Sequence, residues 1–397
     1  MEFLTDAFGL AVAHNGYIFR TTDGGTFWNV QKVEVTGQIF GRDESLHGVS
    51  IVDSGFAVAA GPGGTVFRTT NGGISWQSVG YPSLPGTFWI EDVDFVNRNV
   101  GWIVGLDQDL GHDRTVYRTT DGGNTWSQAM SRNSYMWAVD FVDEQYGWIA
   151  TIGELFFRTT NGGATWIQGT LPPSPVTTIV SDMRFANREV GWVVGWYGYV
   201  ARTTDGGVTW ALQDLGGPPD PDILFSVHVV SATEAWATGR ESDVTREGVV
   251  YHTTNGGISW SRQVIAEDPY WGYAIAGSPS GHVWIGGYEG RILKRTAPTG
   301  VGDNGEYEIA SAFRLEQNYP NPFNPSTTIR FEVTGSGFLS LKVYNLLGQE
   351  VATLVNEQMR PGSYEVQWDA SGMPSGVYCY RLSSGGFSET KRMVLLR

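Results

Sequence analysis

Acidic side chains are the groups in this sequence that could carry out acid–base chemistry. Glu91 and Asp92 are adjacent in one loop, and acids of other loops are Asp43, Glu44, Asp107, Asp109, Glu241 and Asp243. A glycosidase needs two carboxyl groups roughly 5 to 10 Å apart, one of which donates a proton. No spacing in the sequence selects such a pair. We therefore expect no catalytic residues, and Glu91 and Asp92 are the candidates if the protein is an enzyme.

Large aromatic side chains in or near these loops are candidates for ligand binding without catalysis. Their rings can stack on sugars or grip a peptide, although packing in the core and at the rim is an alternative that the sequence leaves open. Together with Glu91, the predicted ligand-binding residues are Trp89, Tyr135, Trp137, Trp196, Tyr197 and Trp271.

One acidic run has the residue types of a calcium loop. Asp107, Asp109, Gly111 and Asp113 spell D-x-D-x-G-x-D, whose oxygen atoms could fold around Ca²⁺. The run lacks the following glutamate and the length of an EF-hand loop, so the three aspartates are weak metal candidates and a solvated acidic loop is the preferred interpretation. The single cysteine excludes a cysteine-built zinc site, and we expect no cofactor.

A nine-residue pattern must position these loops, because it recurs six times at intervals of 40 to 50 residues. Its first copy, RTTDGGTFW, covers residues 20–28. The Asp or Asn residues of the copies are Asp23, Asn71, Asp121, Asn161, Asp205 and Asn255, and the tryptophans are Trp28, Trp76, Trp126, Trp166, Trp210 and Trp260. Asp-Gly and Asn-Gly predict a tight hairpin turn with positive φ.

Each copy lies within a unit of four short predicted strands. Four strands per 40 to 50 residues is the signature of a β-propeller. We count seven blades over residues 1–297, with the seventh beginning at Trp271 and lacking its outer strand. Alignment of the blades places five residues at one inner-strand position that could line the mouth of a central channel: His47, Glu91, Trp137, Ser181 and Phe225.

The stretch from Thr21 to Trp28 and its counterparts resembles the Asp-box, or BNR, repeat. The form with a preceding Gly-Trp strand looks most like the propellers related to the photosystem II assembly factor family. This resemblance implies that the box lies on the outer hairpin of each blade, away from the central pocket. The box residues are then expected to close turns and pack between blades.

The end of the chain differs from the repeats. We expect a linker over 298–312 and a small antiparallel β-sandwich over 313–397, because segments such as TTIRFEV alternate between apolar and polar residues. NYPNPFNPSTTI (318–329), VYNLLGQEVATLV (343–355) and WDASGMPSGVYCYRL (368–382) resemble the C-terminal sorting domain of type IX secretion substrates. The resemblance implies an Ig-like module, type IX machinery as a partner, and a secreted protein or one on the outer-membrane surface of a Gram-negative bacterium.

Charge and termini limit the remaining possibilities. Lys and Arg number 26 against 41 Asp and Glu, and the net charge of −15 argues against a nucleic-acid partner. No apolar run approaches the length of a transmembrane segment. The start, MEFLTDAFGLAVA, has no basic n-region, and the first blade begins near Phe3. We therefore expect an N-terminally truncated first blade that lacks one strand, and a signal peptide missing from this chain.

Two function classes follow from these features. The first is a secreted or cell-surface propeller that acts as a binding or scaffold module for a glycan or protein ligand. The alternative is a secreted glycoside hydrolase of the sialidase or xyloglucanase kind, because hydrolases and non-enzymatic propellers share the box. The expected fold class is all-β, with a seven-bladed propeller followed by a small Ig-like β-sandwich.

Overall fold

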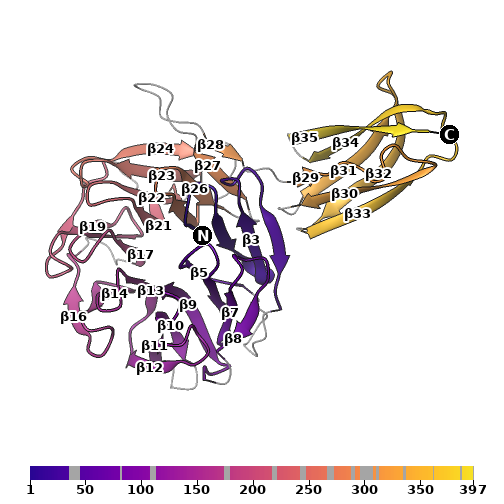
Figure 1. Cartoon of the computed structure of the whole chain (residues 1–397). Coiled ribbons are helices and arrows are strands. Elements are labelled where there is room, and N and C mark those ends of the chain that lie inside the picture. The colour runs from indigo at the N-terminus through magenta and orange to yellow at the C-terminus, as the bar shows by residue number, and fades with distance from the viewer. Residues whose placement is uncertain are drawn as a thin grey trace.

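A computed structural model describes the chain as a ring of β-sheets followed by a β-sandwich (Figure 1). The described residues are 1–34, 45–80, 83–107, 113–173, 179–216, 221–241, 247–265, 272–287, 291–295, 307–309, 313–333, 337–360, 362–384 and 387–396. The ring contains seven four-stranded antiparallel sheets, and each sheet is built from strands that follow one another in the chain. The predicted all-β fold is confirmed, and the seven sheets are consistent with the seven blades predicted from the repeats.

The inner strand of each sheet comes first in the sequence and the outer strand last. The first three sheets consist of β1 (Glu2–Phe3), β2 (Gly9–Val12), β3 (Tyr17–Thr21) and β4 (Asn29–Lys32); β5 (Gly48–Ile51), β6 (Ala57–Gly61), β7 (Thr65–Thr69) and β8 (Gln77–Val79); and β9 (Phe88–Phe95), β10 (Gly101–Asp107), β11 (Asp113–Thr119) and β12 (Ser127–Arg132). A single 3₁₀ turn, η1 (His14–Gly16), precedes β3.

The remaining sheets repeat this order around the ring. They consist of β13 (Met136–Phe141), β14 (Gly147–Thr151), β15 (Leu155–Thr159) and β16 (Ile167–Thr170); β17 (Val180–Phe185), β18 (Gly191–Gly195), β19 (Val200–Thr203) and β20 (Ala211–Leu212); β21 (Ile223–Val229), β22 (Ala235–Arg240), β23 (Gly248–Thr253) and β24 (Ser261–Ile265); and β25 (Ala274–Gly277), β26 (Val283–Gly286), β27 (Ile292–Arg295) and β28 (Tyr307–Ile309).

The expectation that the seventh blade lacks its outer strand is wrong. The seventh sheet has an outer strand, β28, in which Tyr307 pairs with Arg295 of β27. This strand lies inside the 298–312 stretch that the sequence analysis assigned to a linker. The first sheet has an inner strand as well: β1 is only two residues long, but Phe3 pairs with Gly9 of β2.

The first and seventh sheets close the ring by packing against each other. The Phe3 ring stacks on Trp284 of β26 with centroids 3.6 Å apart, and Trp284 Nε1 donates a hydrogen bond to the carbonyl of Gly24 at 3.1 Å. The fourth and fifth sheets meet in the same way, since Phe185 stacks on Trp148 at 3.5 Å. The ring is therefore closed by the same kind of Phe–Trp stacking that joins the fourth and fifth sheets.

The loop that carries the box is longer than the predicted tight turn. Between β3 and β4 it spans residues 22–28, although its two glycines have the predicted positive φ, 71° and 78°. Thr21 Oγ1 donates to Asp23 Oδ1 at 2.9 Å, and the same oxygen accepts the Phe27 N–H at 3.0 Å. The short polar side chains thus replace the missing ladder hydrogen bonds and hold a seven-residue loop.

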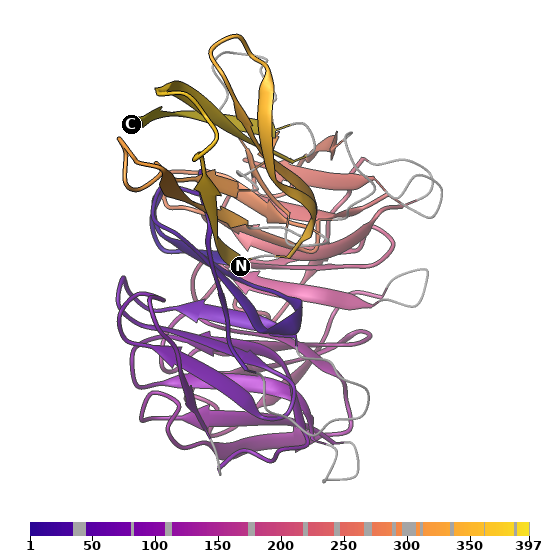
Figure 2. The same cartoon turned by 90° about the vertical axis from the view of Figure 1, so that its right-hand side faces the viewer.

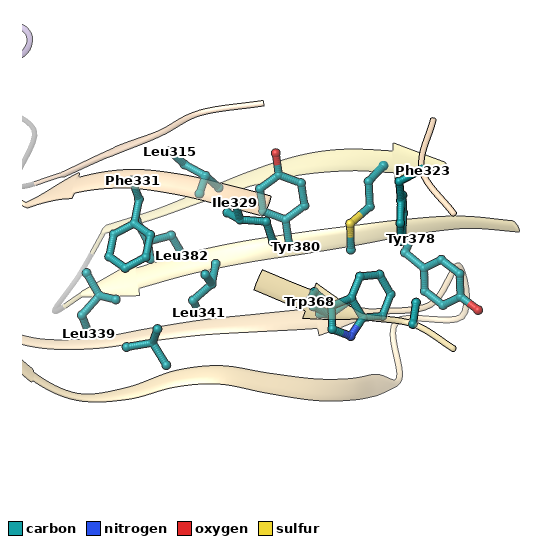
Figure 3. Close-up of a cluster of buried hydrophobic side chains, with 14 of the residues drawn as sticks. Leu315, Phe323, Ile329, Phe331, Leu339, Leu341, Trp368, Tyr378, Tyr380 and Leu382 are labelled. Carbon is teal, nitrogen blue, oxygen red and sulfur yellow. The ribbon is translucent and has the colours of Figure 1, made fainter. Parts of the chain in front are cut away.

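The tail is a separate two-sheet sandwich, which Figures 1 and 2 place beside the first and seventh sheets of the ring. One sheet has the order β29 (Phe313–Leu315), β30 (Ser326–Val333) and β33 (Gly362–Asp369), and the other has the order β32 (Glu350–Met359), β31 (Gly337–Tyr344), β34 (Gly376–Ser384) and β35 (Phe387–Leu395). Alternate side chains of the strands, among them Ile329, Phe331, Leu341, Trp368 and Tyr380, fill the space between the sheets (Figure 3). The tail therefore has a hydrophobic core of its own.

Candidate functional site

The inner strands place one ring of side chains around the axis of the propeller. In each sheet the ring residue pairs with the equivalent position of the second strand, and this position is Trp in five of the seven sheets. The ring residues are Glu2, Ser50, Asp94, Asp140, Arg184, His228 and Ala276. Residues two positions earlier form a second ring in six sheets: Gly48, Asp92, Ala138, Asp182, Ser226 and Ala274. Both rings line a cavity of about 400 Å³, which is within the usual range for ligand pockets.

The acids of these rings tie neighbouring blades together. An inner strand is the edge of its sheet, so some of its N–H groups have no partner in the ladder. Asp94 Oδ2 accepts the Phe141 N–H at 2.6 Å, and Asp140 Oδ2 accepts the Phe185 N–H at 2.8 Å. In each case a carboxylate of one blade binds the edge of the next, which explains why acids face the axis.

Arg184 lies at the centre of this acidic wall. Its guanidinium nitrogens lie 3.6 Å from Asp92, 3.5 Å from Asp140 and 3.6 Å from Asp182, and one also donates to the carbonyl of Val139 at 3.1 Å. The lining contains six carboxyl groups, which are Glu2, Glu91, Asp92, Asp94, Asp140 and Asp182. The cavity wall therefore contains many more acidic groups than guanidinium groups.

Burial changes the protonation equilibria of the wall. It raises the pKa of Asp140 to about 6 and, with the added repulsion of Asp140, the pKa of Asp94 well above its ordinary value. Burial and, to a smaller extent, the positive charge of Arg184 lower the pKa of His228 to about 4. At neutral pH the imidazole is therefore uncharged, whereas the carboxyl groups ionise at an energetic cost.

We expect the Asp140 carboxyl group to make the propeller more stable in mild acid. Its raised pKa gives a stabilising contribution that is fully present below the unfolded value near 3.8 and is lost as the pH rises through about 6. Urea unfolding of the full chain at pH 5 and pH 7 measures this. From pH 7 to pH 5 the unfolding free energy should increase in the unchanged protein, and this increase should be about 1 kcal/mol smaller in the Asp140→Asn variant. Identical pH dependence in both proteins would contradict this assignment.

The predicted ligand-binding residues separate into those that line the cavity and those around it. Glu91 and Trp137 line the cavity. The Tyr135 ring stacks 6.3 Å from Trp137 and is half-exposed, and Trp89 lies 5.6 Å from the His47 ring, which also lines the cavity.

The other predicted aromatics are not part of the lining. Trp196 and Tyr197 contact each other in the loop between β18 and β19, with ring centroids 6.4 Å apart. Trp271 lies outside the described residues. Tyr273 does line the cavity, 5.3 Å from Phe225 and 41% exposed, and sequence reasoning missed it.

The two catalytic candidates do not form an evident acid–base pair. Asp92 Oδ1 accepts the Val93 N–H at 2.9 Å, and Oδ2 accepts the Val139 N–H at 3.0 Å. Both oxygens therefore already serve as backbone acceptors. Glu91 Oε2 lies 3.5 Å from Nδ1 of His47.

Within the described residues, the calcium candidates do not form a metal-binding group. Asp107 is buried and accepts a hydrogen bond from the Tyr117 hydroxyl at 3.0 Å, so the expectation of a solvated loop is wrong for this residue. Asp109 and the side chain of Asp113 lie outside the described part. Among the residues that are described, no group of three or more His, Cys, Asp or Glu could hold a metal ion. That part also contains no helix suited to crossing a bilayer.

The box residues lie between the third and fourth strands of their blades and are not part of the cavity lining. Trp28 and Trp126 are buried and meet the aromatic residue of the inner strand edge-on, Trp28 with Phe3 at 5.6 Å and Trp126 with Phe95 at 5.9 Å. Asp121 Oδ1 accepts the Thr125 N–H at 2.9 Å, as its counterparts do in other blades. These contacts are those of loop closure and packing.

Sequence comparison identifies two families. The model of the photosynthesis system II assembly factor YCF48 matches residues 84–175 and 173–269, and the model of the secretion system C-terminal sorting domain matches residues 317–396. The matches to the assembly-factor model within the ring and to the sorting-domain model in the tail agree with the resemblances that the motifs predict. No curated protein matches the chain.

Several solved structures share the fold. YCF48 bound to D1 peptide is 19% identical, with 75% of this chain and 92% of that chain covered and a TM-score of 0.57. YCF48 from Cyanidioschyzon merolae is 15% identical, with 73% and 93% covered and a TM-score of 0.51. The GH74 xyloglucanase from Xanthomonas campestris is 12% identical, with 83% and 57% covered and a TM-score of 0.60. At these identities the likeness shows the fold alone.

Proposed function

We propose that this protein is a secreted or surface-displayed binding module that holds a polypeptide partner at the mouth of the central cavity. The observation that carries this proposal is a cavity of about 400 Å³ bordered by exposed aromatic rings. Tyr135 and Tyr273 are 50% and 41% exposed, and Trp137 lies at the wall. Exposed aromatic side chains around a concavity are typical of surfaces that bury them on binding.

A polypeptide is the ligand class that the comparisons favour. The solved YCF48 structure with the D1 peptide shows that a propeller of this fold can hold a peptide. A mouth with aromatic rings and carboxylates offers both apolar contact and hydrogen-bond acceptors to a peptide chain. The sorting domain supports the location, because such a domain implies export through the secretion machinery.

A secreted glycoside hydrolase is the alternative, because a GH74 xyloglucanase shares the fold. Glu91 and Asp92 are its catalytic candidates, but they are neighbours on one strand, and both oxygens of Asp92 accept backbone hydrogen bonds. Hydrolysis of xyloglucan or an aryl glycoside by the full chain, abolished by Glu91→Gln without loss of folding, would establish this alternative.

We expect the full chain to bind one or more peptides of a peptide array. The Trp137→Ala variant should bind them at least about tenfold more weakly, because a large aromatic residue at the centre of an interface contributes much of its binding energy. Ile258→Ala is the matched control, since Ile258 is 86% exposed in a box loop on the outer side of its blade. A glycan array run in parallel tests sugars as ligands. The proposal is wrong if no peptide binds, or if both variants bind peptides as the unchanged protein does.

We also expect the tail to act as an export signal by itself. Residues 313–397 fused to a reporter with a signal peptide should bring it to the surface or medium of a host with type IX secretion, because the sandwich has its own core. Cell fractionation measures the outcome, with the reporter lacking the tail as control. Retention of both reporters in the periplasm would contradict the assignment.

A further inference from the structure

We propose that the central cavity takes a cationic side chain, the guanidinium or ammonium group of an Arg or Lys residue that the bound polypeptide presents. This inference rests on the proposed function and names the chemistry of its ligand. The cavity combines three features that point to such a group: carboxyl groups that form no ion pair with the described residues, an imidazole without a hydrogen-bond partner among those residues, and small side chains beside aromatic rings.

Two acidic side chains of the wall, Asp94 and Glu2, feel the positive charge of Arg184 only at longer range. Arg184 is within 4 Å of Asp92, Asp140 and Asp182, whereas Asp94 and Glu2 have no ion pair among the described residues. One oxygen of Asp94 accepts the Phe141 N–H and one oxygen of Glu2 accepts the Ile51 N–H. The second oxygen of each group makes no hydrogen bond within the described part of the chain and can accept one from a cationic ligand. Burial raises the pKa of Glu2 to about 7 and that of Asp94 well above its ordinary value, and a cation beside them would favour their ionised forms.

His228 provides an independent indication of a missing ligand. It lines the cavity beside Arg184, and the described residues supply no hydrogen-bond partner to its ring. The imidazole is neutral near pH 7, so one ring nitrogen is an acceptor. An N–H donor from a ligand in the cavity can hydrogen-bond to this nitrogen.

The lining also contains small side chains beside aromatic rings. The seventh blade carries Ala274 and Ala276 at the positions where the third blade carries Asp92 and Asp94. The rings of Phe225 and Tyr273 lie 5.3 Å apart along the lining and can pack against an alkyl stem or a cation. A long apolar stem with a charged head matches this arrangement better than a metal ion, since the described residues form no metal-binding group.

The test compares N-acetyl-arginine amide with N-acetyl-citrulline amide, its uncharged isostere, by ligand-observed NMR on the full chain. We expect the arginine probe to bind at least about tenfold more tightly, because the two probes differ in charge but hardly in shape. Binding should weaken at least about fivefold in Asp94→Asn, which keeps an acceptor for the Phe141 N–H. Glu189→Gln removes an exposed acid that does not line the cavity and should leave binding unchanged.

Glu91→Gln is a second variant, because the Glu91 side chain makes no backbone hydrogen bond within the described residues and its change should not affect folding. This variant should also weaken binding of the arginine probe. Equal binding of the two probes, no binding of the arginine probe, or equal effects of Asp94→Asn and Glu189→Gln would overturn the cation proposal. Peptide-array binding that depends on Trp137 would then still support the proposed function. Arginine binding without any array signal would support the cavity site and reject the polypeptide role.

Discussion

Replacing Arg184 by methionine is expected to destabilise the propeller by about 2 to 4 kcal/mol, because it leaves buried carboxylates without their cation. Asp92, Asp140 and Asp182 all lie within 4 Å of this guanidinium, and they come from three different blades. Their mutual repulsion is then opposed by hydrogen bonds from backbone N–H groups and by the Ser226 hydroxyl, which donates to Asp182. Urea unfolding of the full chain, followed by tryptophan fluorescence, measures the loss.

Arg188→Met is the matched control for this prediction. Arg188 follows on the same segment and pairs with Asp143 at 2.6 Å, but its side chain is 55% exposed. An exposed ion pair contributes at most about 1 kcal/mol. Asp140→Asn should restore part of the stability lost in Arg184→Met, because it removes one uncompensated charge. If both arginine variants unfold at the same urea concentration, the central cluster does not have the electrostatic role assigned to it.

The Gly122→Val variant should lose at least about 2 kcal/mol of unfolding free energy, because Gly122 has a φ of 71° that β-branched residues resist. A Cβ atom at this position would also lie 2.7 Å from the carbonyl oxygen of Arg98 in the same blade. Backbone atoms cannot move aside as a flexible side chain can, so strain and overlap add. Thermal and urea unfolding of the full chain measure the effect.

Gly153→Val separates the two contributions. Gly153 has a φ of 86°, but a Cβ atom there would meet nothing within 4 Å. This variant should therefore show the cost of backbone strain alone and be clearly more stable than Gly122→Val. Equal stabilities would mean that the box loop does not pack against the inner hairpin of its own blade as described.

The sequence predicts the repeated architecture well because each turn and strand is indicated by a few neighbouring residues. Each box supplies two glycines at positive φ, and alternation along segments such as β30 places Ile329 and Phe331 in the core of the sandwich. The outer strand of the seventh blade was missed because Tyr307–Ile309 is three residues long and follows a Gly-rich stretch without alternation. Only its main-chain pairing with β27 identifies it as a strand.

The candidate site was predicted only in part. Glu91 and Trp137 were found by aligning the blades, and the structure places both in the cavity lining. The ring that includes Asp94 and Arg184 was missed, because its seven members differ in chemical type and none stands out in a single sequence. The strand pairing shows how the ring could have been found. Each ring residue pairs with one position of the second strand, and this position is Trp in five blades. Aligning the inner strands relative to that tryptophan would therefore have identified the ring.

The central claim is that the partner binds at the mouth of the cavity, and site-specific photo-crosslinking tests it most directly. We place p-benzoylphenylalanine at the position of Tyr135 or, as control, at the position of Ile258; both side chains are exposed, at 50% and 86%. The probe is the array peptide that binds the full chain most tightly. The account predicts crosslinks from position 135 and few from position 258. Efficient crosslinking from position 258 with none from position 135 would contradict it.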